Sequence, residues 1–257
     1  MRFQQKLSAI QKKNNSLVCV GLDQGEFEFD KKIIEKTHDL VCAYKPNFSF
    51  YEARGETGWR DLKLTAEYLR KNYPEVVTIA DAKRADIGNS NQGYVKAIFD
   101  ELKFDAVTVH PYLGREAVLP FLERADKGIF VLCRTSNPGA GEFQDLKVGS
   151  AAGSGQKPLW QAVTEGVRDD WNENGNVMLV AGATYPEELK KIREVVGEMT
   201  LLVPGVGAQG GDVAKTVKAG VNSRGAGMIV NSSRGIIFAD DPRTAAEKLR
   251  DEINSFR

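Results

Sequence analysis

The chain has 257 residues, and its 35 basic residues are balanced by 35 acidic ones, so the formal net charge is zero. Such a balance creates no overall field toward nucleic acid or an anionic membrane, so any anion must be bound locally. Hydrophobic residues make up 42% of the chain and charged residues 27%, which argues against disorder and provides for one substantial core. This length permits a barrel of βα units in one domain without requiring it.

The first residues and the cysteines indicate where the protein resides. Three apolar side chains at helical spacing within Met1 to Asn15 predict an additional N-terminal helix rather than a signal peptide. Cys19, Cys42 and Cys133 lie singly in apolar runs, which indicates neither a disulfide framework nor a zinc site and favours the reducing cytoplasm. No apolar run approaches the roughly 18 residues that a membrane helix needs.

Short apolar runs of strand length recur along the chain, each followed by a polar turn and a helical pattern. The expected strands are Leu17 to Asp23, Val41 to Asn47, Val76 to Arg84, Ala106 to Tyr112, Gly128 to Ser136, Asn176 to Thr184, Leu201 to Gly207 and Gly227 to Arg234. The expected helices include Asp30 to Leu40, Thr57 to Asn72, Asn91 to Leu102, Gln156 to Asn172, Tyr185 to Val196 and Asp212 to Ala219. This alternation predicts a parallel sheet covered by helices, because parallel strands need long crossovers.

Eight such units without an interrupting linker favour a single (β/α)8 TIM barrel over residues 1–257. A doubly wound open sheet is the alternative, since strand order cannot be read from periodicity. The longest irregular stretch, Asn137 to Gly155, follows the fifth strand and holds seven glycine or serine residues. A loop of this length is more often functional than accidental.

Charged residues fall at the carboxyl ends of the first three strands, namely Asp23, Lys45, Asp81 and Lys83. In a parallel barrel these ends share one rim, where catalytic side chains lie. Asp81 and Lys83 are two residues apart, so on a regular strand they face the same way, and Ala82 faces the other. Ordinary ion pairs would explain any one of these residues. For the whole set a functional site is favoured, because burying unpaired charges costs on the order of several kcal/mol per ion.

Two loops have a composition that suits phosphate, Pro204 to Gly211 after the seventh strand and Asn231 to Gly235 after the eighth. Glycines let backbone N–H groups approach an anion, and Arg234 can donate two hydrogen bonds to phosphate oxygens. The loops after these two strands are also the usual phosphate site of this architecture.

Other signals are weaker. Glycines 205, 207 and 210 form G-x-G-x-x-G, but a dinucleotide site expects an acidic residue about 20 positions later, where Ile229 to Ser232 stand. His110 ends the fourth strand on the same rim, and a structural role is favoured over a place in the pocket lining. His38 is placed in the middle of a helix, on its surface. Two such distant histidines do not indicate a transition-metal site.

The segment Asp81 to Asp86 has the pattern D-x-K-x-x-D, which resembles the signature of the orotidine 5′-phosphate decarboxylase family in its longer bacterial type. Further segments resemble the family in order: Val20 to Asp23, Tyr44 to Asn47, Arg134 to Pro138, Gly182 to Glu188, Pro204 to Gly211 and Asn231 to Gly235. The resemblance spans nearly the whole chain. One departure is Val206, where an aromatic residue is more usual, and it concerns loop packing rather than chemistry.

The resemblance implies decarboxylation of orotidine 5′-monophosphate to UMP and CO2, the last step of de novo pyrimidine nucleotide synthesis, without cofactor or metal. Lys83 is implied as the proton donor to C6, with Asp81 beside the departing carboxylate and Lys45 and Asp86 completing the charged set. The implied substrate contacts are Asp23 and Lys45 at the ribose, Ser136 at the pyrimidine amide edge, and Gln209, Arg234, Pro204 and Ser233 around the phosphate. A homodimer is also implied, in which Asp86, Ile87 and Ser90 reach into the site of the neighbouring subunit.

The chemistry agrees with these roles. Loss of CO2 leaves an electron pair on C6 with no cofactor or adjacent carbonyl to delocalise it, so the enzyme must stabilise a localised carbanion electrostatically. Carboxylates on either side of Lys83 favour its protonated form. A grip on the distant phosphate would supply binding energy to close loops and exclude water.

Two other functions are weighed against this one. A relative on the same barrel that acts on a sugar phosphate with Mg2+ also carries D-x-K-x-x-D, but a metal site would favour a carboxylate where Lys45 stands. A non-catalytic protein that binds a phosphate ligand would keep Gln209 and Arg234 and lose part of the charged set. All of that set is present in the sequence.

Overall fold

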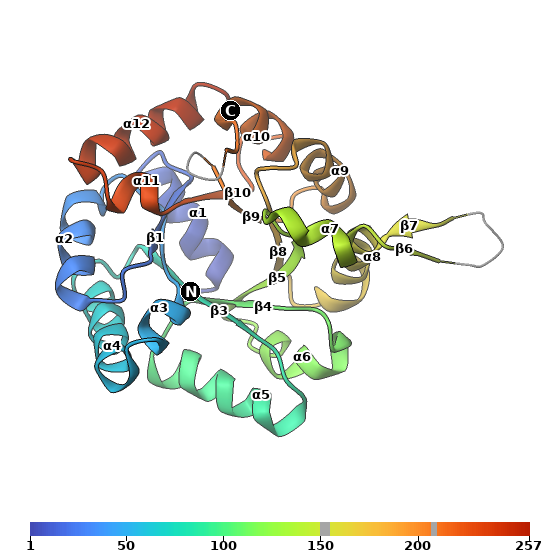
Figure 1. Cartoon of the computed structure of the whole chain (residues 1–257), viewed down its shortest axis with the longest axis horizontal. Coiled ribbons are helices and arrows are strands. Elements are labelled where there is room, and N and C mark those ends of the chain that lie inside the picture. The colour runs from blue at the N-terminus through green and yellow to red at the C-terminus, as the bar shows by residue number, and fades with distance from the viewer. Residues whose placement is uncertain (150–154, 207–209) are drawn as a thin grey trace.

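The computed structural model describes residues 1–149, 155–206 and 210–257, and in this part of the chain eight parallel strands close into a barrel (Figure 1). The barrel strands are β1 Val18–Leu22, β2 Ala43–Pro46, β3 Val77–Arg84, β4 Ala106–Val109, β5 Gly128–Arg134, β8 Val177–Ala181, β9 Leu201–Pro204 and β10 Met228–Ser232. They follow one another around the barrel in chain order, and β10 pairs with β1. This order confirms the (β/α)8 barrel and excludes the doubly wound sheet.

Helices form a ring outside the strands (Figure 1). The longer ones are α2 Phe27–Thr37, α4 Gly55–Asn72, α5 Gly88–Val95, α6 Gly114–Leu122, α8 Leu159–Gly166, α9 Pro186–Val196, α10 Val213–Gly220 and α12 Pro242–Asn254, and π-helical turns, Lys96–Glu101 and Val167–Trp171, continue α5 and α8. Short helices α3 Phe48–Glu52 and α11 Arg234–Ile237 follow β2 and β10. Each strand and its helix bury apolar side chains between them, which is the packing that the alternating pattern predicts.

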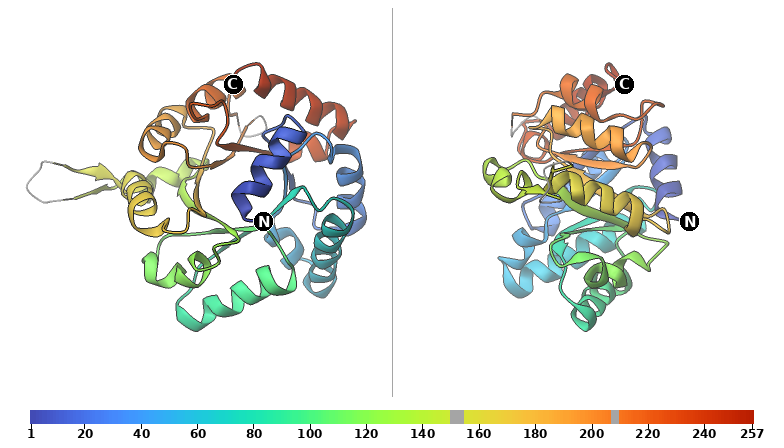
Figure 2. Two further views of the ribbon diagram at one scale, coloured as in Figure 1. Left: turned by 180° about the vertical axis from the view of Figure 1, so that it is seen from behind. Right: turned by 90° about the vertical axis from the view of Figure 1, so that its right-hand side faces the viewer.

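The predicted N-terminal helix is present as α1, Phe3–Lys13. It crosses the barrel end where the strands begin (Figure 2, left), and Phe3, Leu7 and Ile10 are buried there. The ring of Phe3 meets that of Phe130 in β5 edge to face, with centroids 5.8 Å apart. The end of the barrel opposite the charged rim is therefore closed by apolar packing.

Several predicted boundaries were wrong. The helix expected from Asp30 to Leu40 begins at Phe27 and ends at Thr37. The helix expected from Gln156 begins at Leu159, because Lys157–Pro158 forms β7, which pairs antiparallel with β6, Lys147–Val148. Asn137 to Gly155 is also less irregular than expected, since it contains a 3-10 turn, the short helix α7 Gly141–Gln144, and β6. In Figure 1 the β6–β7 arm extends outward beyond the ring of helices.

Candidate active site

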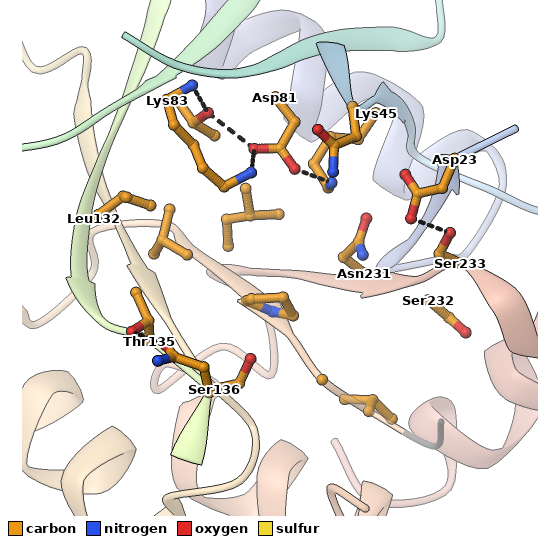
Figure 3. Close-up of a pocket in the computed structure, with 18 of the residues that line it drawn as sticks. Asp23, Lys45, Asp81, Lys83, Leu132, Thr135, Ser136, Asn231, Ser232 and Ser233 are labelled. Carbon is orange, nitrogen blue, oxygen red and sulfur yellow. Dashed lines mark hydrogen bonds and ion pairs between the residues drawn. The ribbon is translucent and has the colours of Figure 1, made fainter. Parts of the chain in front are cut away.

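The carboxyl ends of the barrel strands surround a cavity of about 440 Å³ (Figure 3). The predicted residues that line it are Asp23, Lys45, Asp81, Lys83, Ser136, Pro204, Ser233 and Arg234. Leu132, Val180 and Leu202 supply apolar wall from β5, β8 and β9. The structure therefore brings the charged strand ends and the residues expected at phosphate into one cavity.

Asp81 lies between two ammonium groups. Its Oδ2 is 2.5 Å from Lys45 Nζ, and its Oδ1 is 2.7 Å from Lys83 Nζ (Figure 3). Lys45 and Asp81 are buried, whereas the Lys83 side chain is 47% exposed. The Lys83 ammonium thus faces the open cavity, and its partner Asp81 is held on the other side by Lys45.

The charges of this pair act against the effect of burial. Burial alone would raise the pKa of the Asp81 carboxyl, but Lys45 and Lys83 outweigh it and hold that pKa well below its usual value. Burial would likewise lower the pKa of the Lys45 ammonium, yet Asp81 and Asp23 raise it above its usual value. Both groups of the buried pair therefore remain charged near neutral pH.

Lys83 reaches this position through an irregular backbone. Its φ is +47°, in the left-handed region that side chains with a Cβ rarely adopt. Ala80 pairs with Val107 and Arg84 with Val109, so three residues of β3 lie opposite the single residue Thr108 of β4. Asp81 and Lys83 both line the cavity, as predicted. The prediction that a regular strand directs both side chains there was wrong, because a bulge in β3 does so.

Unpaired acceptors lie on the β1–β10 side of the cavity. The Ser233 hydroxyl is 2.5 Å from Asp23 Oδ2 and 3.0 Å from the Gly21 carbonyl oxygen. A Cβ at Gly21 would stand 2.9 Å from that of Ser233, so the approach of β10 to β1 requires glycine there. Asp23 Oδ1 and Asn231 Oδ1 are buried and have no hydrogen-bond partner among the described residues. Hydroxyl groups of a ligand are the natural donors to such oxygens.

The end of β5 contributes Thr135, Ser136 and Asn137 to the cavity wall. Gln144 of α7 fixes this turn, because its Oε1 accepts from the Thr135 backbone N–H at 3.0 Å and its amide nitrogen donates to the Thr135 hydroxyl at 2.8 Å. Arg134 stacks on Tyr185 with its guanidinium carbon 3.9 Å from the ring centroid. The loop that carries Ser136 is thus held from two sides.

Some predicted site residues lie elsewhere. Asp86, Ile87 and Ser90 do not line the cavity of their own chain. Ile87 is 61% exposed, and Asp86 Oδ1 accepts a hydrogen bond from the Ile87 N–H at 2.7 Å. Gln209 lies outside the described residues. His110 does not line the cavity, and its Nε2 is 3.1 Å from the Ala85 carbonyl oxygen, in line with the structural interpretation.

The prediction for His38 needs a correction. This residue follows the last turn of α2 rather than standing in mid-helix, and it is half-buried rather than on the surface. Its ring stacks on that of Tyr73, with centroids 4.3 Å apart.

Other residues that line the cavity were only weakly indicated by the sequence. Asn47, Thr108, Thr135, Asn231 and Ser232 line the cavity but were not singled out. Asn47, Thr135, Asn231 and Ser232 stood inside segments that carry the family resemblance, so their neighbours in the sequence could have indicated them. Thr108 precedes His110 by two residues at the end of the fourth strand, and only this alternation pointed to the rim.

A closed (β/α)8 barrel with ionised groups gathered at the carboxyl ends of its strands defines a barrel enzyme, because this rim is where such folds place their catalytic groups. The model of the orotidine 5′-phosphate decarboxylase / HUMPS family matches residues 16–249. The chain belongs to this family.

Relatives support this assignment over the full length. The orotidine 5′-phosphate decarboxylase of Ralstonia pickettii is 44% identical, with all of both chains covered. That of Dehalococcoides mccartyi is 45% identical and covers all of this chain and 99% of its own. Among solved structures, Leishmania donovani OMP decarboxylase superposes with a TM-score of 0.91 at 38% identity, covering 100% of this chain and 99% of that one. No helix in the described part of the chain is long and apolar enough to cross a membrane.

Proposed function

We propose that this chain decarboxylates orotidine 5′-monophosphate to UMP and CO2, with Lys83 as the proton donor to C6. The observation that carries the proposal is the ion-paired row of Lys45, Asp81 and Lys83, in which the outermost ammonium faces the cavity. The full-length relatives that bear the decarboxylase name support the same reaction.

The geometry supports an electrostatic mechanism. When the bond between C6 and the carboxylate breaks, CO2 leaves and the electron pair stays on C6, where the ammonium of Lys83 stabilises it and then transfers its proton. Asp81 cannot turn away, because both of its oxygens are held by lysines. Its fixed negative charge beside the substrate carboxylate would disfavour the ground state relative to the carbanion.

The remaining cavity residues divide along the substrate. The unpaired oxygens of Asp23 and Asn231 would accept hydrogen bonds from ribose hydroxyls, and Lys45 lines the same cavity. Ser136 would contact the pyrimidine amide edge. Arg234, Ser233 and Pro204 lie where the seventh and eighth strands end and, with Gln209, would surround the phosphate.

We also propose that the active enzyme is a cytoplasmic homodimer whose chain forms one barrel domain over residues 1–257. Asp86, Ile87 and Ser90 lie beyond the end of β3, outside their own cavity, and Ile87 is an exposed apolar side chain. In the proposed dimer these residues would complete the site of the second copy. Cys19, Cys42 and Cys133 are unpaired, which fits a reducing compartment.

The test follows the absorbance of orotidine 5′-monophosphate with a chelator present. Lys83→Ala should lower turnover by roughly 10²- to 10⁴-fold, the usual contribution of a general acid, while nucleotide binding persists. Lys13→Ala, which removes an exposed lysine of α1, serves as the control and should leave turnover unchanged. Near-normal turnover by Lys83→Ala would refute the mechanism. Loss of wild-type activity with EDTA, restored by Mg2+, would favour the metal-dependent relative instead.

The shared site has its own test. Lys83→Ala and Asp86→Ala chains, each inactive alone, should on mixing form dimers with one intact site, and activity should return to about a quarter of the wild-type value after random exchange. No recovery after confirmed subunit exchange would contradict a site that spans two subunits.

A further inference from the structure

Thr108 makes contacts that no role described so far uses. Its Oγ1 accepts a hydrogen bond from the backbone N–H of Lys83 at 3.0 Å and donates one to Asp81 Oδ1, also at 3.0 Å. The same Asp81 oxygen pairs with Lys83 Nζ at 2.7 Å. The backbone of Lys83, the Thr108 hydroxyl, the Asp81 carboxylate and the Lys83 ammonium therefore form a closed ring of contacts.

We propose that Thr108 is a positioning residue for the decarboxylation, because its hydroxyl fixes the backbone of Lys83 relative to the carboxylate that holds the Lys83 ammonium. The inference rests on the proposed role of Lys83 as proton donor. It assigns to Thr108 the task of keeping that ammonium at the place where the electron pair develops.

The backbone of Lys83 needs such support. A residue with a Cβ in the left-handed region costs of the order of 1–3 kcal/mol and persists only where the surroundings dictate it. Thr108 is the β4 residue opposite the bulge, and it is 1% exposed, so its side chain has little freedom. Its single hydrogen goes to Asp81 and a lone pair receives the Lys83 N–H, which fixes both ends of the bulge at once.

A purely structural threonine would behave differently. If Thr108 only filled space beside β3, valine would replace it with nearly the same shape. If it positions Lys83, removing the hydroxyl takes away the hydrogen-bond acceptor of the Lys83 N–H and lets the bulge relax. Displacement of a reacting group by about 1 Å can cost roughly 100-fold in rate.

The experiment measures kcat and KM for Thr108→Val, Thr108→Ala and Thr108→Ser. Both variants without the hydroxyl should lower kcat by roughly 10- to 100-fold with KM nearly unchanged, because the hydroxyl reaches neither the ribose nor the phosphate groups proposed above. Thr108→Ser keeps the hydroxyl and should restore most of kcat. Thr108→Ala also deletes the hydroxyl without adding volume, so it answers the question if the valine variant fails to fold.

Thr37→Val is the matched control. The Thr37 hydroxyl is also fully buried and bonded, to the Ile33 carbonyl oxygen at 2.8 Å and the Tyr44 hydroxyl at 2.7 Å, but it lies on α2. This variant should lose stability and keep kcat. Wild-type kcat in the folded hydroxyl-free variants, or a serine variant as slow as they are, would overturn the inference. Near-normal turnover by Lys83→Ala would instead show that the proposed role of Lys83 as proton donor is wrong.

Discussion

The barrel mouth and the helical layer outside it each bury an aspartate, and the two carboxyl groups meet different partners. Asp81 at the mouth contacts two ammonium groups, which hold its pKa well below the usual value although burial acts the other way. Among the described residues, the Asp30 carboxyl of α2 receives only hydroxyl hydrogen bonds, from Tyr51 at 2.6 Å and Thr65 at 2.9 Å. Burial raises the pKa of Asp30 to about 7 despite these bonds.

The comparison shows that burial alone does not determine the charge of a carboxyl group. At the mouth, fixed cations keep the carboxylate ionised, and a charged row faces the ligand cavity. In the helical layer no cation contacts Asp30, and Oδ1 of that residue has no partner among the described residues. The buried carboxyl group that stays ionised is therefore the one at the ligand cavity.

Asp81→Asn tests the charge pairing at the barrel mouth and should have the largest effect of the three substitutions. The substitution preserves shape but leaves the buried Lys45 without its counter-ion, so the free energy of unfolding should fall by about 3–5 kcal/mol. Turnover should be lost as well, because Lys83 also loses its anchor. Urea unfolding and activity measured at pH 7.5 check both effects. A variant of wild-type stability would show that the pair contributes little.

Asp30→Asn should give a smaller effect that depends on pH. Between the pKa of an unfolded aspartate, about 3.9, and about 7, folded Asp30 keeps a proton that the unfolded chain has released, so wild-type stability declines as pH rises. Asparagine removes this decline. The variant should therefore gain on the order of 2 kcal/mol relative to wild type between pH 5 and pH 7. Equal differences at the two pH values would contradict a neutral Asp30.

Asp39→Asn should have the smallest effect of the three. This aspartate faces solvent, and its bonds to Arg243 lower its pKa to about 2. Its stabilising contribution is present above the unfolded pKa and is lost only as pH falls toward 2. Because the pair is solvent-screened, the loss at neutral pH should be about 0.2–1 kcal/mol by urea unfolding. A loss comparable to that of Asp81→Asn would show that solvent exposure does not weaken the pair.

Much of the fold was predictable because its signals are local. Apolar runs such as Val18 to Leu22 predict buried strands, and charged residues at the strand ends, such as Asp23 and Lys45, indicate the rim of the barrel. The bulge at Lys83 was not predictable, because it depends on the register between β3 and β4, which no local pattern encodes. For the same reason Thr108 was missed, since its importance arises from the strand opposite.

Asn231 was missed as a site residue for a related reason. An asparagine at the end of a strand carries no signal of its own, and only the structure shows that its oxygen is buried at the cavity with no partner among the described residues. The arm of β6 and β7 was missed because two-residue strands carry no periodicity.

The apolar packing of α1 under the barrel has a kinetic consequence. With Phe3, Leu7 and Ile10 buried at the amino-terminal end, the described residues close that end, and a ligand exchanges with solvent at the rim formed by the carboxyl ends of the strands. Whatever enters there must also leave there, so a nucleotide product that lingers in the cavity shuts out the next substrate and acts as its direct competitor.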